Sequence, residues 1–298
     1  MLSKMRPVLL IVFMLFLSGC KVAMLDPKGS IAADEKHIML TSLALMSIIV
    51  IPVIILAFLF AWRYREGNTK AEYLPNWSHS TLLEVIWWSV PCVIIIILGY
   101  ITWTSTLRLD PYKAINNPAK PIEIQVISLE WKWLFIYPEQ HIATINYVEF
   151  PVDVPVRFYI TAEGPMNSFQ IPQLAGQIYA MAGMQTKLNL IANELGIYQG
   201  YATNLTGNGF SDMKFTARAT SRAEFNQWVK QVKSSPHQLT MNAYNQLAQQ
   251  KDNHAVSYYS FAASDIYEVA MMKYMMPMPN RGEAILSNRS HDAGKKHV

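Results

Sequence analysis

Thiols are the reactive side chains whose possible chemistry is easiest to delimit in this 298-residue chain, because it contains only Cys20 and Cys92. A thiolate can act as a nucleophile, ligate a soft metal ion or form a disulfide. Neither cysteine lies after residue 100. The C-terminal two thirds of the chain therefore has no thiolate ligand, no cysteine nucleophile and no disulfide.

The first cysteine follows a leader that is typical of secretion signals. Lys4 and Arg6 precede an apolar run over 7–16, which is too short to span a bilayer, and Ser18-Gly19 come directly before Cys20. This ending resembles the lipobox of bacterial lipoproteins, which are cut before the cysteine and carry a diacylglycerol on its sulfur. We therefore expect a signal peptide over 1–19 and a covalent acyl lipid on Cys20.

Two later segments have the length and composition of transmembrane helices. Neither 38–62 nor 85–106 contains a charged residue, and each is long enough to cross about 30 Å of hydrocarbon at about 1.5 Å per residue. A buried helix of a soluble protein would show a polar stripe, which both segments lack. Pro52 and Pro91 lie inside them and predict kinks, because neighbouring groups in a membrane can satisfy the carbonyls that proline leaves free.

The orientation of the two spans follows from the lipobox rather than from charge, since three basic residues lie on each side of the first span. Lipobox processing happens outside the cell membrane, so residues 20–37 are expected outside and the loop 63–84 inside. The chain after residue 106 is then periplasmic.

An all-β domain is predicted over 121–220. Ile122, Ile124 and Val126 alternate with polar residues, which is typical of a strand, and the pattern continues through Trp131-Lys132-Trp133. Short strands separated by Pro, Gly and Asn favour a β-sandwich or Greek-key barrel. The further strands expected are 144–150, 156–162, 186–192, 197–204 and 213–219.

The region 221–278 is predicted to be helical and aromatic-rich. Ser221 and Glu224 have the spacing of a capping box, in which each side chain satisfies the other residue's backbone amide. A second helix is expected over 241–249. Residues 279–298 have the composition of a disordered tail.

Composition excludes some classes of partner. The net charge is +4 and no basic stripe with interleaved aromatic residues is present, so a nucleic-acid partner is not expected.

Three motifs resemble subunit II of the haem–copper oxidases. They are the run Asn76 to Pro91, which contains Trp-Ser-His-Ser-Thr-Leu-Leu-Glu, the run Met166 to Pro172, and the run Gly200 to Met213. The last two resemble the segments that build the family's binuclear copper site. The resemblance implies a two-helix transmembrane hairpin and an all-β cupredoxin-like Greek-key domain with C-terminal helices.

Most copper ligands of that family have no counterpart here. The resemblance matches Asn167 and Phe210 to the two histidines, Ala202 and Thr206 to the two cysteines, and Asn204 to the glutamate, so that only Met213 is retained. Because such a site needs soft thiolate and imidazole donors, no metal is expected in this chain. Gly200, Gly207 and Gly209 are expected to keep the tight loop that once surrounded the ligands.

A lipobox-bearing subunit II without copper ligands is similar to subunit II of cytochrome bo-type ubiquinol oxidases. The resemblance implies an accessory subunit of a proton-pumping enzyme in the bacterial inner membrane that oxidises ubiquinol and reduces O2 to water. The partners implied are a catalytic subunit I, which would hold the haems and one copper, smaller membrane subunits and the lipid bilayer. No cofactor is expected in this chain apart from the lipid on Cys20.

Glu84 is the candidate for a role in proton transfer. It lies one residue before the second uncharged run, where a negative charge near a helix N-terminus is favourable in itself. The resemblance instead places it at the cytoplasmic mouth of a proton pathway into subunit I, and this is the interpretation that we prefer.

Two further clusters have simpler interpretations. Trp131 and Trp133 are expected to pack in the sandwich core or at a subunit interface, since without copper they have no electron-entry role. Five methionines near the C-terminus could bind Cu(I), but adaptable packing against a partner is the preferred interpretation. These are Met271, Met272, Met275, Met276 and Met278.

Two other functions were weighed. A copper-containing cytochrome c oxidase subunit is disfavoured by the absence of cysteine after residue 100. A stand-alone lipoprotein that acts as a sensor or an oxidase assembly factor would share the anchor and the β domain. It would differ from an oxidase subunit in that it would not copurify with haem.

Overall fold

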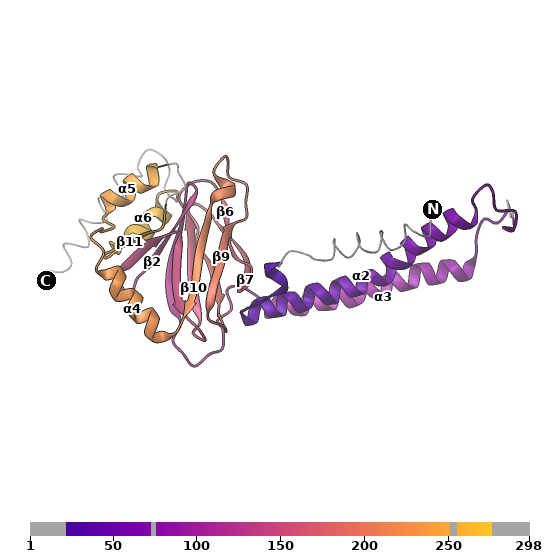
Figure 1. Cartoon of the computed structure of the whole chain (residues 1–298), viewed down its shortest axis with the longest axis horizontal. Coiled ribbons are helices and arrows are strands. Elements are labelled where there is room, and N and C mark those ends of the chain that lie inside the picture. Colours follow the sequence, from indigo (N-terminus) through magenta and orange to yellow (C-terminus); the bar gives the residue numbers. More distant parts are fainter. Residues whose placement is uncertain (1–21, 73–75, 251–254, 276–298) are drawn as a thin grey trace, which may run out of the picture. The chain divides into compact units, whose positions relative to one another are not determined.

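The computed structural model describes residues 22–72, 76–250 and 255–275, so the predicted signal peptide, Cys20 and the C-terminal tail lie outside the described residues. The chain divides into two compact units. One is a helical unit, Asp34–Asp110, and the other contains the β domain together with the short segment that precedes the first long helix (Figure 1).

The helical unit consists of two long apolar helices, α2 (Ser30–Arg63, whose first turn belongs to the other unit) and α3 (Thr81–Arg108). Both are long and apolar enough to cross a membrane, and each extends past its predicted charge-free stretch at both ends. Pro52 and Pro91 lie inside them. Among the described residues of this unit only Ile94 is buried, so the apolar side chains face outward and require a non-aqueous surrounding.

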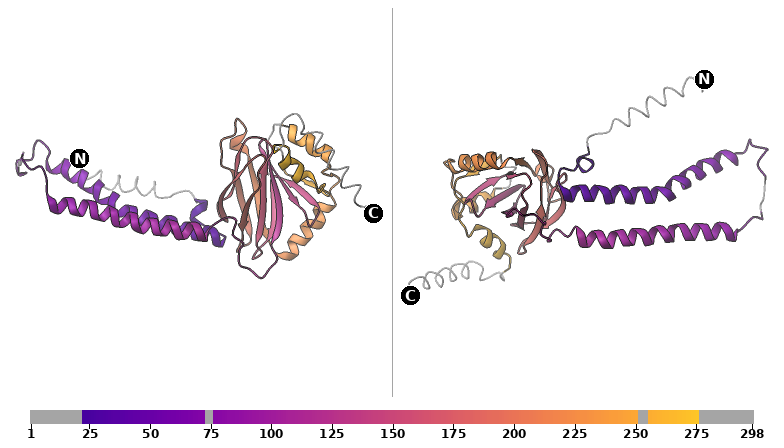
Figure 2. Two further views of the ribbon diagram at one scale, coloured as in Figure 1. Left: turned by 180° about the vertical axis from the view of Figure 1, so that it is seen from behind. Right: turned by 90° about the horizontal axis from the view of Figure 1, so that it is seen from below.

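The β domain is a sandwich of two sheets (Figure 2). The six-stranded sheet has the order β11-β3-β2-β1-β5-β8, and the five-stranded sheet has the order β4-β10-β9-β6-β7. Two parallel pairs, β1 with β5 and β10 with β4, join segments that are distant in the chain. The strands of the first sheet are β1 (Ile122–Leu129), β2 (Lys132–Tyr137), β3 (Ile142–Ile145), β5 (Val156–Ala162), β8 (Thr186–Leu190) and β11 (Ser257–Tyr259). Those of the second are β4 (Tyr147–Pro151), β6 (Asn167–Ile171), β7 (Ala175–Ala180), β9 (Gly196–Ala202) and β10 (Lys214–Thr220).

The predicted all-β cupredoxin-like domain is therefore confirmed, with corrections to individual strands. The single strand expected over 144–150 is two strands in different sheets, because Asn146 adopts φ 55° and turns the chain between them. Strands β6, β7 and β11 were not predicted. Trp131 was placed on a strand with Trp133, which is wrong: Trp131 lies in the β1–β2 turn with φ 60°, whereas Trp133 lies on β2.

The core between the sheets is built from the alternating apolar residues of the strands. On β1, Ile122, Ile124 and Val126 face this core, whereas Ile127 and Leu129 face the opposite side of the sheet. That opposite side is a second core, which the C-terminal region covers. The six-stranded sheet is thus buried on both faces over much of its area.

The described residues of the C-terminal region form three helices and one strand. The first helix packs on the core between the sheets, and the other two cover the opposite side of the first sheet. Helix α4 (Arg222–Lys233) begins with the predicted capping box, since Ser221 Oγ accepts from Glu224 N and a Glu224 carboxylate oxygen accepts from Ser221 N. Helix α5 (Met241–Gln249) has the predicted bounds, and α6 (Ile266–Met272) follows β11. Figure 1 shows these helices beside the sheet that contains β2 and β11. The region is therefore part of the β domain rather than an appendage.

The segment before α2 is fastened to the β domain. After a short 3-10 helix, η1 (Ala23–Leu25), the backbone of Lys28 donates to Gln173 O and accepts from Asn193 N. A Cβ on Gly29 would lie 2.4 Å from the carbonyl oxygen of Ile191, so only glycine fits this approach. The start of the described chain is thus held at one fixed place on the domain.

Candidate functional site

Two neighbouring strands bring the predicted ligand positions together. Strands β6 and β9 pair antiparallel with Phe169 opposite Ala202, so Asn167 and Ala202 lie near the same end of the five-stranded sheet. The chain then runs through a loop over 203–209 and a 3-10 turn, η2 (Phe210–Asp212), to Met213. The amide of Ala202 donates to the carbonyl of Met213 at 3.1 Å, which closes the loop at its base.

Asn167 and Met213 are in direct contact at the centre of this site. Asn167 Nδ2 lies 3.0 Å from Met213 Sδ and 3.3 Å from Ser128 Oγ, and Asn167 Oδ1 accepts from Ser168 N at 2.8 Å. Both side chains are almost fully buried, at 2% and 1% exposed. The thioether sulfur, the one retained soft donor, therefore accepts a hydrogen bond from an amide that occupies the position of a histidine ligand.

The loop donates hydrogen bonds to β6 and to the residue that precedes it. Asn204 Nδ2 donates to Met166 O at 2.8 Å, and Thr203 N donates to Ser168 O at 3.0 Å. The buried Thr206 Oγ1 has no hydrogen-bond partner among the described residues. Phe210 is half-buried and contributes its backbone, since its carbonyl accepts from Met213 N. The site is thus assembled, and among the described residues Asn167 and Met213 are the two predicted ligand positions whose side chains are joined by a hydrogen bond.

The three glycines of the motif have different roles. Gly207 adopts φ +112°, which only glycine tolerates readily, and a Cβ on Gly209 would lie 2.2 Å from the ring of Trp131. These two glycines keep the loop tight, as predicted. Gly200 does not lie in a turn: it is on β9, where a Cβ would meet the Phe215 ring at 2.0 Å.

Trp133 is a core residue, as one of the two predicted packing interpretations required. Its ring is fully buried and packs edge-on against Phe169 and Phe215, with distances between ring centroids of 5.2 Å and 5.9 Å. Trp131 is half-buried and covers the loop through Gly209. Trp131 therefore lies in the β1–β2 turn and Trp133 in the core, rather than side by side on one strand face.

The donor chemistry of the described residues is poor for a transition metal. No group of three or more His, Cys, Asp or Glu side chains lies close enough to hold a metal ion in the part of the chain that the structure describes. The sequence adds no cysteine after Cys92. The arrangement can hold a loop in a fixed shape, but Met213 is its only soft donor.

Comparisons with known proteins agree with the motifs. Residues 137–220 match the family model described as cytochrome c oxidase subunit II, periplasmic domain, and residues 233–278 match the COX aromatic rich motif. A cytochrome bo(3) ubiquinol oxidase subunit 2 from Pseudomonas aeruginosa is 48% identical over 95% of this chain and 84% of its own length. The chain belongs to the ubiquinol oxidase subunit II family.

Two further relatives support the same assignment. A cytochrome bo(3) ubiquinol oxidase subunit 2 from Pseudomonas putida is 51% identical over 88% of this chain and 83% of its own length. A ubiquinol oxidase subunit 2 from Acetobacter aceti is 48% identical over 87% and 85% of the two chains. Each match covers most of both chains, so the membership applies to the membrane hairpin as well as to the β domain.

Glu84 lies in the first turn of α3, and its backbone N–H donates to Ser80 O at 2.9 Å. Its side chain is exposed in the isolated subunit. This position fits a favourable interaction with the helix dipole and also fits exposure to a partner subunit. The role of Glu84 in proton transfer therefore stays a prediction.

Two buried carboxylates were not predicted from the sequence. Glu149, on β4, is 1% exposed, accepts from Tyr147 Oη and lies 4.0 Å from Arg218 Nη1. Burial raises the pKa of the Glu149 carboxyl, although Tyr147 and Arg218 act in the opposite direction. Glu163, at the end of β5, accepts from Tyr244 Oη on α5 and from Lys273 Nζ just after α6. Strand alternation alone could not reveal these carboxylates, because Arg218, Tyr244 and Lys273 come from distant segments.

The Glu163 group holds the C-terminal region on the sheet. Lys132 on β2 makes a second such contact, since its fully buried ammonium group donates to Gln250 O, just after α5, at 2.8 Å. Burial raises the pKa of Tyr267 on α6 to about 12. The aromatic-rich region of the family is thus fixed by charged hydrogen bonds as well as by apolar packing.

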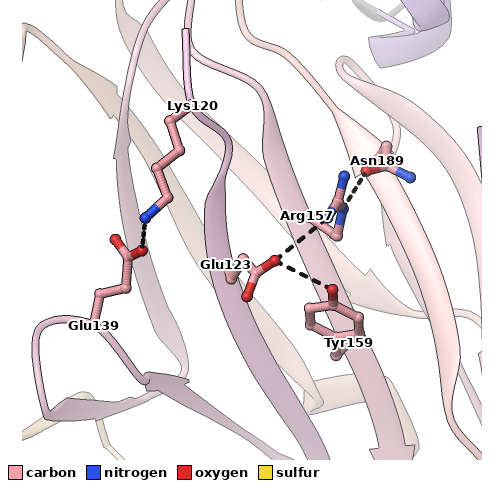
Figure 3. Close-up of polar contacts among 6 residues, drawn as sticks. All are labelled: Lys120, Glu123, Glu139, Arg157, Tyr159 and Asn189. Atoms are coloured by element: carbon pink, nitrogen blue, oxygen red, sulfur yellow. Dashed lines mark hydrogen bonds and ion pairs between the residues drawn. The ribbon is translucent and has the colours of Figure 1, made fainter. Parts of the chain in front are cut away.

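The outer face of the six-stranded sheet carries a polar ladder beyond the second core (Figure 3). Glu123 on β1 accepts from Arg157 Nη1 at 3.3 Å and from Tyr159 Oη at 3.2 Å, and Arg157 Nε donates to Asn189 on β8. Asn189 Nδ2 donates in turn to Pro111 O at 2.9 Å. The ladder ties the chain that enters the domain after α3 to three adjacent strands.

Of the predicted methionine cluster, Met271 and Met272 lie at the end of α6, and Met275 is exposed. Met276 and Met278 lie outside the described residues. The preference for packing over Cu(I) binding stays a prediction.

Proposed function

We propose that this chain is the accessory subunit II of a proton-pumping ubiquinol oxidase in the bacterial inner membrane, and that it holds no copper of its own. The relatives are named as ubiquinol oxidase subunits, which supports the assignment of the complex. The observation that carries the proposed loss of copper is the hydrogen bond from Asn167 Nδ2 to Met213 Sδ.

The donor set does not fit a binuclear copper centre. The positions that would supply thiolates hold Ala202 and Thr206, and the buried Thr206 Oγ1 lacks a partner among the described residues. Those that would supply imidazoles hold Asn167 and Phe210. No electron-transfer step is therefore assigned to this chain, and electrons from ubiquinol are expected to enter subunit I, which holds the haems and one copper.

The role that remains is structural and positional. The six-stranded sheet is buried on both faces, and hydrogen bonds at Lys28 and Pro111 hold the two segments that connect it to the helices, so the β domain is a rigid body outside the membrane. The two apolar helices offer a surface to the catalytic subunit and the smaller subunits. Glu84 at the inner end of α3 is proposed to assist proton entry into subunit I. Cys20 is proposed to carry the acyl lipid after signal cleavage, which would anchor the mature N-terminus.

Purification of the complex through a tag on this chain tests the assignment. The expected product contains haem, oxidises ubiquinol with O2 as acceptor, and does not accept electrons from cytochrome c. A tagged chain that purifies without haem from aerobically grown cells would contradict the proposal and would favour a stand-alone lipoprotein.

Restoring the ligands tests whether the scaffold of the site persists. The five substitutions Asn167→His, Ala202→Cys, Asn204→Glu, Thr206→Cys and Phe210→His, with Met213 kept, should give a coloured copper centre. The matched control carries Asn167→His, Asn204→Glu and Phe210→His but keeps Ala202 and Thr206. It should stay colourless, because it offers the copper ions no thiolate. Failure of the full set to bind copper would show that the loop no longer has the geometry of a metal site.

A further inference from the structure

A small cavity with both polar and apolar side chains in its walls lies between α2 and α3, at the end of the helical unit that continues into the β domain. Its volume is about 160 Å³. It is lined by His37, Ile38 and Thr41 on α2 and by Ile101, Thr104, Ser105 and Arg108 on α3. Because Ile38 begins the charge-free run of α2 and Thr106 ends that of α3, the cavity lies at the boundary between hydrocarbon and headgroups.

The rim of the cavity carries one charge of each sign. Arg108 Nη2 lies 3.4 Å from Asp34 Oδ1 across the two helices, and both side chains are about half exposed. An exposed pair of this kind is held by at most about 1 kcal/mol, so each group can take a new partner at small cost. The guanidinium suits a phosphate, and the carboxylate suits an ammonium group.

The carboxylate at the rim favours a primary ammonium group. A primary ammonium group has three N–H donors for Asp34, whereas a quaternary ammonium group has none. Below the rim, Thr41 Oγ1 donates to His37 O at 2.8 Å and Thr104 Oγ1 donates to Tyr100 O at 3.0 Å, so the helix backbone already uses both hydroxyl hydrogens. The path from the rim to deeper levels therefore gains no charge from these two residues.

An apolar cavity lies deeper between the same helices. Its volume is about 220 Å³, and the residues around Pro52 and Pro91 that line it are apolar, apart from the indole N–H of Trp87. Ile48, at its near end, is about 10 Å further along α2 than Thr41 at about 1.5 Å per residue. The two helices therefore offer a cavity with polar and charged side chains at headgroup depth and an apolar cavity at acyl-chain depth.

We propose that the space between α2 and α3 binds one phosphatidylethanolamine molecule. Its phosphate pairs with Arg108, its primary ammonium group donates to Asp34, and one acyl chain runs past Thr41 and Thr104 toward the cavity at Pro52 and Pro91. Charge complementarity favours this zwitterionic lipid over an anionic one, because Asp34 would repel a second negative charge. The proposal requires only that the two helices span the membrane, and does not rest on the oxidase assignment.

Photo-crosslinking in the intact complex tests the proposal. The complex is placed in nanodiscs with phosphatidylethanolamine that carries a diazirine on one acyl chain, and the labelled peptides are mapped by mass spectrometry. Labelling is expected on the α2 and α3 segments that line the apolar cavity. Loss of a charged hydrogen bond should reduce this labelling about tenfold in Arg108→Gln and in Asp34→Asn, and Arg63→Gln at the other end of α2 should leave it unchanged.

Competition in the unaltered complex gives a second readout that does not depend on variants. Unlabelled phosphatidylethanolamine should displace the probe, whereas phosphatidylglycerol, phosphatidylcholine and inorganic phosphate should not. Equal displacement by phosphatidylglycerol or by phosphate would overturn the proposal in favour of a general anion site. If the amount of labelling were the same with every competing lipid and in every variant, the probe would be in nonspecific contact with bulk lipid, and this result would also overturn the proposal.

Discussion

Replacing Gly200 by alanine should destabilise the β domain, although glycine-to-alanine changes in strands are often neutral or favourable. A Cβ at this position would lie 2.0 to 2.4 Å from three atoms of the Phe215 ring, which is opposite Gly200 in the β9–β10 pair. Phe215 is 1% exposed and stacks on Phe169 at a centroid distance of 4.9 Å, so its ring cannot move away alone. Overpacking of this kind costs about 1 to 3 kcal/mol.

The measurement is urea unfolding of a soluble fragment over 111–275, followed by tryptophan fluorescence. Ile197→Ala on the same strand is the matched control: its side chain is 71% exposed, and the change should stay within about 0.5 kcal/mol. The double variant Gly200→Ala/Phe215→Leu should recover part of the loss, because the two sites are in contact. If Gly200→Ala were as stable as Ile197→Ala, the packing described for this ring cluster would be wrong.

Three further predictions concern the anchor, the proton pathway and pH. The mature chain should begin at an acylated Cys20, and an intact mass without acyl groups would disprove the lipoprotein assignment. Glu84→Ala should slow turnover of the assembled oxidase several-fold with normal haem content, and turnover equal to that of the parent at every pH would leave only the helix-dipole role. Because burial raises the folded-state pKa of Glu149 above its ordinary value, the domain should lose stability as pH rises from about 4.5 through the raised pKa. The free energy of unfolding is measured by urea titration at pH 4.5 and 7. Relative to the parent, Glu149→Gln should be more stable at pH 7 than at pH 4.5. If the difference in unfolding free energy between variant and parent were the same at both pH values, the burial argument would be refuted.

Local signals in the sequence located the elements that depend on local chemistry. The Ser221–Glu224 capping box marked the start of α4, and the helix expected over 241–249 coincides with α5. The alternation of apolar residues located β1 and β5, because one face of each is in the core. Where a strand's own side chains determine which face is buried, the alternation of apolar and polar residues is enough to locate the strand.

The missed features depend on partners that are distant in the chain. Strand β6 has a register shift between Phe169 and Ile171, and β11 has three residues that are ordered by pairing with β3. The turns at Asn146 and Trp131 both use positive φ at residues other than glycine, and the alternation of apolar and polar residues carries no sign of such turns. Likewise, the motif located the six ligand positions, but the Asn167–Met213 contact could be found only once β6 and β9 were seen to pair.

Metal analysis of the purified complex tests the central claim most directly. Copper and haem iron are measured on the same sample, and the copper content is expressed per complex. A copper-free subunit II predicts one copper per complex, held by subunit I, and no binuclear copper signal in the electron paramagnetic resonance spectrum. Three coppers per complex, or such a signal from this chain, would contradict the account.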